Sequence, residues 1–181
     1  MFIDDTIAAI ATATGEGGIG IIRISGTHSL EIAKKVFRSI SNKQPEEYPR
    51  TLCYGHIVKD NTVLDEVLTV YMPAPHTYTK EDIVEIQCHG GMIATKMILE
   101  WVLENGARMA EHGEFTKRAF LNGRIDLSQA EAIKDIISAQ TAKSFLVAQN
   151  QLQGSISNKI KSIRNKVTED VARITVAVDF P

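Results

Sequence analysis

Three separated groups of residues have side chains suited to binding a polar or anionic ligand. Arg23 follows a run in which four of the six residues Gly15 to Gly20 are glycines, and a guanidinium can bind a carboxylate through two hydrogen bonds. Glu81, beside Asp82, offers a carboxylate that can accept two hydrogen bonds from an amino-pyrimidine edge. Arg124 stands between two expected helices, from which it can extend over a pocket. Each group also has a structural interpretation: a surface arginine, a solvated acidic pair, and a cation favoured by a helix dipole.

The glycine run has the letters G-x-G-x-x-G of a dinucleotide-binding turn. That turn needs a helix after it, whereas the alternating β-branched residues 19–25 predict a strand. A phosphate-binding P-loop is excluded as well, because no Gly-Lys-Ser/Thr occurs in the chain. The run therefore predicts a loop between two strands. It serves either close approach to a ligand, with Gly18 and Gly20 as candidate contacts, or a tight turn that needs positive φ.

A second candidate contact is the turn His89-Gly90-Gly91, between an expected strand and an expected helix. Backbone amides at a helix N-terminus suit an anion or a polar ring edge, so His89 and Gly90 are candidate ligand contacts. His89 could also transfer a proton, or have only a structural role. A Cys88 nucleophile is disfavoured, because adjacent residues of a strand point to opposite faces and no third orienting group is identifiable.

The elements that must position these residues change in character near residue 114. Before it, β-branched runs alternate with two helical patterns, so residues 1–113 are predicted to form an α+β domain with a mixed sheet. The expected strands and helices of this part are Thr6–Ala11, Ile19–Ser25, helix Ser29–Ile40, the hairpin Leu52–Val58 and Val63–Met72, Ile83–Cys88, helix Met92–Glu104 and Ala107–Ala110. Residues 114–181 are predicted to be α-helical, the first part of a helical domain.

Two local patterns organise the helical part. Ser128 to Glu131 has the S-x-x-E form of a capping box. An apolar stripe then steps by threes and fours from Ile156 to Val178, and Pro181 is expected to end that helix. Such a stripe must pack on something, either on the preceding helix or on further helices of a longer protein.

Composition excludes several classes of function. The chain has 181 residues, 44% of them hydrophobic, and a formal net charge of -2, whereas a domain that grips nucleic acid through its overall charge is strongly basic. Its two cysteines make no disulfide framework and no zinc-site spacing, so we predict no metal site and a reducing, cytoplasmic location. No signal peptide and no run of about 20 apolar residues is present, so no membrane association is expected.

Several blocks of sequence, in order, resemble the amino-terminal part of the tRNA wobble-uridine modification GTPases, the MnmE/TrmE family. The blocks are Asp5-Thr6-Ile7-Ala8-Ala9, Gly15 to Gly20 with Ile22-Arg23-Ile24-Ser25-Gly26, Glu81-Asp82 with His89-Gly90-Gly91, Gly113-Glu114-Phe115-Thr116 to Ala119-Phe120-Leu121-Asn122-Gly123, Asp126-Leu127-Ser128-Gln129-Ala130-Glu131-Ala132, and Asp179-Phe180-Pro181. The resemblance runs from about Asp4 to the last residue.

This resemblance implies both a fold and a function. The first domain would resemble the tetrahydrofolate-binding domain of aminomethyltransferases, form a homodimer, and bind 5-formyltetrahydrofolate or a related reduced folate as one-carbon donor. Carried over by position, Arg23, Glu81 and Arg124 match the family's folate contacts. Arg124 stands where the family usually has lysine, so a planar fork replaces a point donor.

The resemblance also implies a further domain and a partner subunit that lie outside these residues. A GTPase domain, with GTP, Mg²⁺ and K⁺, would be inserted in the helical domain. The whole protein would work with an FAD-dependent partner subunit (MnmG/GidA) to place a (carboxymethyl)aminomethyl-type group on the wobble uridine of tRNA. The chain is thus expected to be a non-catalytic piece of that GTPase. A pure assembly module and a stand-alone folate-dependent one-carbon transferase remain the alternatives.

Overall fold

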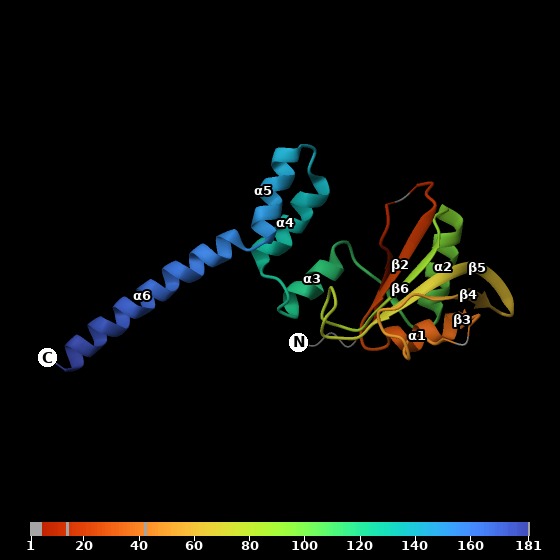
Figure 1. Ribbon diagram of the computed structural model, residues 1–181, viewed down its shortest axis with the longest axis horizontal. Helices are drawn as coiled ribbons and strands as arrows, with labels where there is room; N and C mark the ends of the chain where they lie inside the picture. Colours follow the sequence, from red (N-terminus) through yellow and green to blue (C-terminus); the bar gives the residue numbers. More distant parts are fainter. Residues whose placement is uncertain (1–4, 14, 42, 181) are drawn as a thin grey trace. The chain divides into compact units, whose positions relative to one another are not determined.

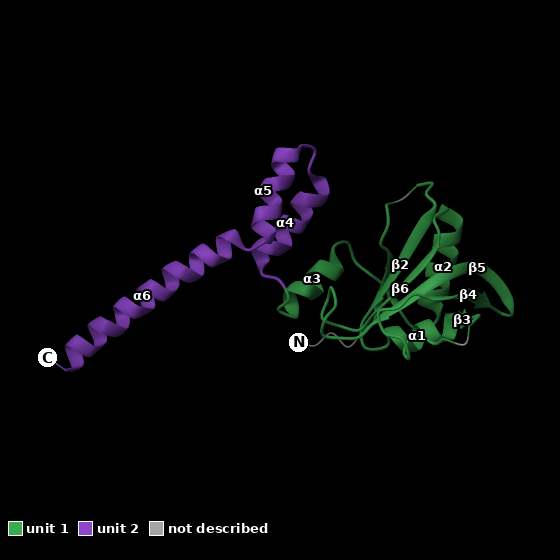
Figure 2. Ribbon diagram, viewed as in Figure 1, with its two compact units in different colours: residues 1–124 green, residues 125–181 purple. Residues whose placement is uncertain are grey.

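The computed structural model describes residues 5–13, 15–41 and 43–180. The chain divides into two compact units, residues 1–124 and 125–181 (Figure 2). Unit 1 is α+β, and the described residues of unit 2 form helices joined by short connections, as the sequence predicts. The division falls after the expected boundary at residue 113. Helix α3 (Glu114–Leu121) belongs to unit 1, and the Asn122 side chain that follows it donates a 2.7 Å hydrogen bond to the Thr79 carbonyl of that unit.

Unit 1 is built on one mixed sheet with the strand order β3-β4-β5-β6-β2-β1-β7 (Figure 1). Only β1 and β7 pair in parallel among the described strands; every other pair is antiparallel. The strands are β1 (Ile7–Ile10), β2 (Ile19–Ser25), β3 (Phe37–Ser39), β4 (Cys53–Lys59), β5 (Thr62–Met72), β6 (Ile83–His89) and β7 (Arg108–Met109). Because β2 begins at Ile19, within the glycine run, a strand and not a helix follows the turn, and the run is not a dinucleotide-binding turn.

Helices α1 (Ser29–Val36) and α2 (Met92–Glu104) pack against one face of this sheet. Ile22 and Ile24 of β2 and Ile86 of β6 are fully buried in the same cluster as Ile98 of α2. Since side chains alternate along a strand, Arg23 and Glu85 lie on the other face of the sheet. The alternation thus separates an apolar core from a polar face that can carry a site.

The hairpin between β4 and β5 forms where the sequence predicts it. Asp60 and Asn61 both have positive φ, 48° and 63°, which matches the primed turns that suit the twist of two-residue hairpins. Their short polar side chains tolerate this left-handed conformation.

The expected helix Ser29–Ile40 ends early, at Val36. Phe37 instead begins β3 and pairs with Ile57 of β4. Its ring lies over Gly55, where an added Cβ would come within 2.5 Å of a ring carbon. A long-range contact with a glycine therefore overrides the local helical period.

Unit 2 contains α4 (Leu127–Ser138), α5 (Ala142–Leu152) and α6 (Ser155–Asp179). The predicted capping box at Ser128 is wrong by two residues: Asp126 is the N-cap, with reciprocal 2.9 Å hydrogen bonds to Gln129. Asp126 and Gln129 have the spacing of a capping box too, with an N-cap residue followed three positions later by a glutamine. Aspartate is as favourable an N-cap residue as serine. The apolar stripe lies on α6, none of whose residues is buried. Pro181 lies outside the described residues.

Over the described residues, every helix is too short or too polar to cross a lipid bilayer.

Candidate functional site

Arg23 is held on the polar face of the sheet by the strand beside it. Its Nε donates to Oε1 of Glu85 at 2.8 Å, and its Nη2 lies 2.7 Å from the same oxygen. The pair follows from the register, which sets Arg23 of β2 opposite Glu85 of β6. The arginine, with 27% of its side chain exposed, is accessible but not free.

Tyr78 brings Arg23 and Arg124 together, although they are about a hundred residues apart in sequence. The guanidinium carbon of Arg23 lies 5.4 Å from the centre of the Tyr78 ring, and that of Arg124 lies 4.7 Å from it. Arg23 also lies over Phe115, at 5.6 Å. These are cation–π distances, so each guanidinium is attracted by a ring face. The Tyr78 hydroxyl is hydrogen-bonded to Thr116 Oγ1 at 2.9 Å, which ties the ring to α3.

Glu81 lies three residues beyond Tyr78, on the same loop. Its Oε2 accepts a 2.7 Å hydrogen bond from Ser25 Oγ, and Nη1 of Arg118 lies 3.2 Å from Oε1. Asn122 Nδ2 is 3.5 Å from Oε1. The protein therefore orients the carboxylate, and 19% of the Glu81 side chain is exposed.

A network of ionised groups lies behind Glu81. It consists of Arg108, Arg118, Asp5 and Glu114. Hydrogen bonds from Arg108, with further help from Arg118, lower the pKa of Glu114 to about 2. Burial raises the pKa of Asp5, but hydrogen bonds from the same two arginines outweigh this effect and lower it overall. Both carboxylates are therefore ionised at neutral pH.

We refer to Arg23, Tyr78, Glu81, Phe115 and Arg124 as the Glu81 end of the sheet. The other candidates, Gly18, Gly20, His89 and Gly90, form the His89 end. In the register of β2 with β6, Ile19 lies opposite His89, four residues along the strand from Arg23. Four residues of strand span about 13 Å. The structure therefore divides the sequence-predicted residues between two places.

At the His89 end, the histidine has a partner of its own. His89 Nδ1 lies 2.6 Å from Oδ1 of Asp65, and the His89 amide donates to Oδ2 of the same residue at 2.9 Å. The hydrogen bond to Asp65 raises the pKa of His89. The side chain is 72% exposed, at the end of β6 rather than in a turn.

Two of the glycines at this end are explained by packing. A Cβ on Gly90 would lie 2.4 Å from the Gly17 carbonyl oxygen, and one on Gly20 would lie 2.3 Å from Cγ2 of Thr95 on α2. Gly18 has no heavy atom within 4 Å of such a Cβ. A shallow hollow of about 260 Å³ beside Gly18 and His89 is below the usual size of a small-molecule pocket.

Neither a thiol nucleophile nor a metal centre is supported. Cys88 is buried, and burial raises its pKa to about 11, so the thiol stays protonated at neutral pH. Among the described residues, no group of three or more His, Cys, Asp or Glu side chains is placed to hold a metal ion.

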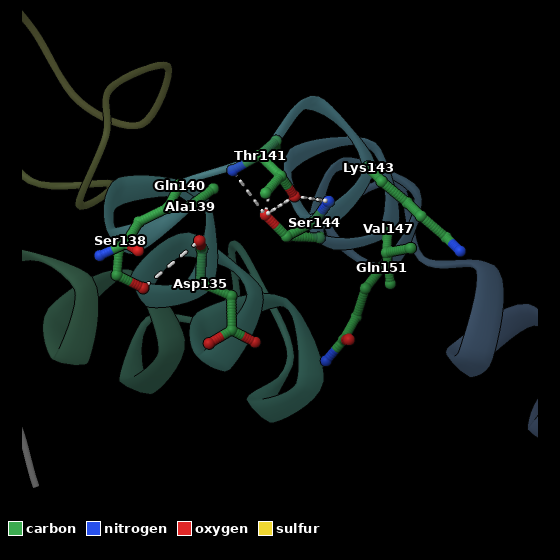
Figure 3. A pocket seen from close by; sticks show the side chains of 10 residues that line it. Asp135, Ser138, Ala139, Gln140, Thr141, Lys143, Ser144, Val147 and Gln151 are labelled. Atoms are coloured by element: carbon green, nitrogen blue, oxygen red, sulfur yellow. Dashed lines mark hydrogen bonds between the residues drawn. The ribbon is translucent and has the colours of Figure 1, made fainter.

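Unit 2 has a hollow of its own, about 650 Å³, at the connection between α4 and α5 (Figure 3). Several of its polar groups are hydrogen-bonded to one another: the Thr141 and Ser144 hydroxyls are 2.9 Å apart, and Ser138 Oγ donates to the Asp135 carbonyl at 3.4 Å (Figure 3). None of the residues predicted from the sequence lines it.

Sequence reasoning missed Tyr78, Phe115 and Arg118. Tyr78 lies between β5 and β6, where no periodic pattern of the sequence marks it as a ligand contact. Arg118 had one usable signal: it follows Glu114 by four residues, on the side of the expected helix that also carries Phe115. Its contacts with Asp5 and Glu81 are set by tertiary structure and have no local signature.

Comparison with known proteins agrees with this arrangement of a sheet domain followed by a helical one. Residues 6–124 match the family model of the GTP-binding protein TrmE N-terminus, and residues 127–181 match that of the MnmE helical domain. The chain thus has the two-part organisation of TrmE-type proteins. It belongs to the MnmE/TrmE family.

Close relatives carry the name tRNA modification GTPase MnmE. The protein from Clostridioides difficile (strain 630) is 61% identical over 182 residues, which cover 100% of this chain and 40% of that protein. The one from Alkaliphilus oremlandii (strain OhILAs) is 60% identical, over 99% of this chain and 40% of the relative. The one from Finegoldia magna is 52% identical, over 98% and 39%. The chain therefore spans about two fifths of the length of these relatives.

Proposed function

We propose that this chain is the reduced-folate-binding and dimer-forming part of a tRNA modification GTPase. The observation that carries the proposal is the meeting of Arg23 and Arg124 on Tyr78, three residues before the oriented carboxylate of Glu81. These are the three residues that the family resemblance marks as folate contacts. Arg23 comes from a strand, Glu81 from a loop and Arg124 from the connection that follows α3.

The groups at the Glu81 end fit the parts of a reduced folate. A carboxylate accepts hydrogen bonds from the amino-pyrimidine edge, guanidiniums donate to the carboxylates of the tail, and aromatic rings offer apolar faces to the ring system. Arg124 is the better candidate for the tail. Its guanidinium has no ion-pair partner in the part of the chain that the structure describes, whereas Arg23 is already paired with Glu85. A bound 5-formyltetrahydrofolate would supply a one-carbon unit.

The activities of the whole protein are part of the same proposal. GTP hydrolysis with Mg²⁺ and K⁺ is assigned to a GTPase domain beyond these residues. The homodimer, formed through unit 1, would act with an FAD-dependent partner on the wobble uridine of tRNA. The names of the relatives support the GTPase and tRNA assignments.

The test is a calorimetric titration of 5-formyltetrahydrofolate into the chain, with sedimentation to measure its oligomeric state. We expect saturable binding by a dimer. Glu81→Gln should weaken binding about 10- to 100-fold, because a charge-assisted hydrogen bond is lost. The matched control is Glu100→Gln, on exposed α2 surface, which should leave affinity unchanged. A folded dimer without saturable binding would reject folate recognition and favour the assembly module.

A further inference from the structure

Arg118 is a fully buried cation beside the proposed ligand site. Its side chain is only 1% exposed, yet it lies on α3, one helical turn beyond Glu114. A charge removed from water in this way is tolerated only when other charges and hydrogen bonds compensate for it. The side chain cannot reach a ligand itself, so any effect on binding must pass through a neighbour.

Three carboxylates compensate the charge of Arg118. Its Nη2 is bonded to Oδ1 of Asp5 and lies 3.2 Å from Oε1 of Glu114. Its Nη1 donates to the Asp5 carbonyl at 3.0 Å and lies 3.2 and 3.4 Å from the two oxygens of Glu81. The buried Nε has no hydrogen-bond partner, so the fork acts wholly through its two terminal nitrogens.

The three carboxylates do not depend on Arg118 equally. Asp5 and Glu114 are each bridged to a second guanidinium, that of Arg108, at 2.7 and 2.6 Å. Over the residues that the structure describes, Glu81 has Arg118 as its sole ion-pair partner. Loss of Arg118 would leave Asp5 and Glu114 paired and Glu81 unpaired.

We infer that Arg118 is a positioning residue for the proposed ligand: it fixes the Glu81 carboxylate in the orientation that accepts adjacent N–H groups such as an amino-pyrimidine edge. This inference rests on the proposed function. Ser25 Oγ holds one Glu81 oxygen at 2.7 Å, and Arg118 lies against both oxygens from the buried side. The contact of Glu81 with Arg118 thus leaves its exposed side for the ligand.

The test compares lysine substitutions at the two arginines of the network. Arg118→Lys keeps the charge but offers a point donor in place of a fork, so it cannot hold Asp5, Glu81 and Glu114 together. We expect the affinity for 5-formyltetrahydrofolate, measured by calorimetry, to fall about 10-fold. The matched control Arg108→Lys disturbs Asp5 and Glu114 but not Glu81. It should lower thermal stability and leave affinity within about twofold.

A double-mutant cycle separates positioning from a general loss of structure. In a Glu81→Gln background, Arg118→Lys should change affinity by less than about twofold, because the residue that it positions is already altered. A loss that simply adds to that of Glu81→Gln would overturn the inference, as would unchanged affinity in Arg118→Lys. Arg118→Gln, which keeps an amide donor without a charge, serves as the second variant.

The outcomes distinguish this inference from the proposed function. If the unmutated chain does not bind the folate, both fall together. If it binds and the cycle shows no coupling, only the role of Arg118 is rejected. If neither Arg118 variant folds while Arg108→Lys does, Arg118 serves stability, and the positioning role is overturned.

Discussion

The two ends of strands β2 and β6 are built in different ways. At the Glu81 end, side chains from a strand, a loop and helix α3 hold one another through charged contacts. At the His89 end, His89 is paired with Asp65, and the other candidates are glycines in close packing, with Gly90 against the glycine run and Gly20 against Thr95 of α2. Polar side chains that are oriented by distant residues and remain accessible are typical of a ligand site, whereas glycines without room for a Cβ serve packing.

The charged network behind Glu81 predicts that the free energy of unfolding of unit 1 falls at acidic pH. The pKa of Glu114 falls from an ordinary 4.5 to about 2 in the folded chain. Its ion pairs therefore stabilise the fold above pH 4.5, and this contribution, up to about 3 kcal/mol, is lost as the pH falls towards 2. Glu114→Gln should lower the unfolding free energy at pH 7 and flatten its dependence between pH 5 and 2 in denaturant titrations. Glu100→Gln should leave the profile unchanged.

Glycine substitutions test the other half of the comparison. Gly90→Ala should destabilise the chain by about 2 kcal/mol, because its Cβ would overlap the Gly17 carbonyl oxygen. Gly18→Ala, with no heavy atom within 4 Å of the added Cβ, should change stability by less than about 0.5 kcal/mol. Thermal unfolding measures both. A costly Gly18→Ala or a neutral Gly90→Ala would contradict the packing explanation.

Arg124 allows the ligand's two ends to be told apart. Arg124→Ala should weaken binding of 5-formyltetrahydrofolate about 10-fold, because a guanidinium donor to the tail carboxylates is lost. It should have little effect on a reduced pterin without that tail. Arg173→Ala, which removes a guanidinium from exposed α6, is the control. An equal loss for both ligands would place Arg124 against the ring instead.

The smallest expected effect concerns His89. Asp65→Asn should lower the raised pKa of His89, as followed by NMR titration, because the hydrogen bond to Asp65 and its charge are the main causes of the increase. Since a raised histidine pKa stabilises the folded chain at low pH and this effect is lost as the pH rises through it, Asp65→Asn should weaken the fold slightly on the acid side only. Folate affinity should not change. A marked loss of affinity would assign the His89 end to the site after all.

Much of the sheet domain follows from local patterns. The alternation in Ile19–Ser25, the apolar period of Met92–Glu104 and the turn at Asp60-Asn61 predict β2, α2 and the hairpin, because local preference and tertiary structure agree there. Local preference and tertiary structure disagree at Phe37. The helical pattern continues through this residue, but its ring packs over Gly55 and the residue forms part of strand β3. Two overlapping cap patterns compete at Asp126 and Ser128, and the sequence alone does not decide between them.

The site was predictable only in part, for a similar reason. Arg23, Glu81 and Arg124 can be selected by residue type and by family resemblance. No local sequence pattern, however, predicts that the two arginines both contact Tyr78. Arg118 contacts Asp5 from more than a hundred residues away in sequence. Such a contact forms only when the strands and α3 pack together, so the periodicity of the sequence does not predict it.

The most direct test of the site's location is an NMR titration of the isotope-labelled chain with 5-formyltetrahydrofolate. We predict saturable chemical-shift changes at Arg23, Tyr78, Glu81 and Arg124. Gly18 and His89, about 13 Å along the strands, should change little. Changes centred on Gly18 and His89, or no saturable change at all, would contradict a folate site at the Glu81 end.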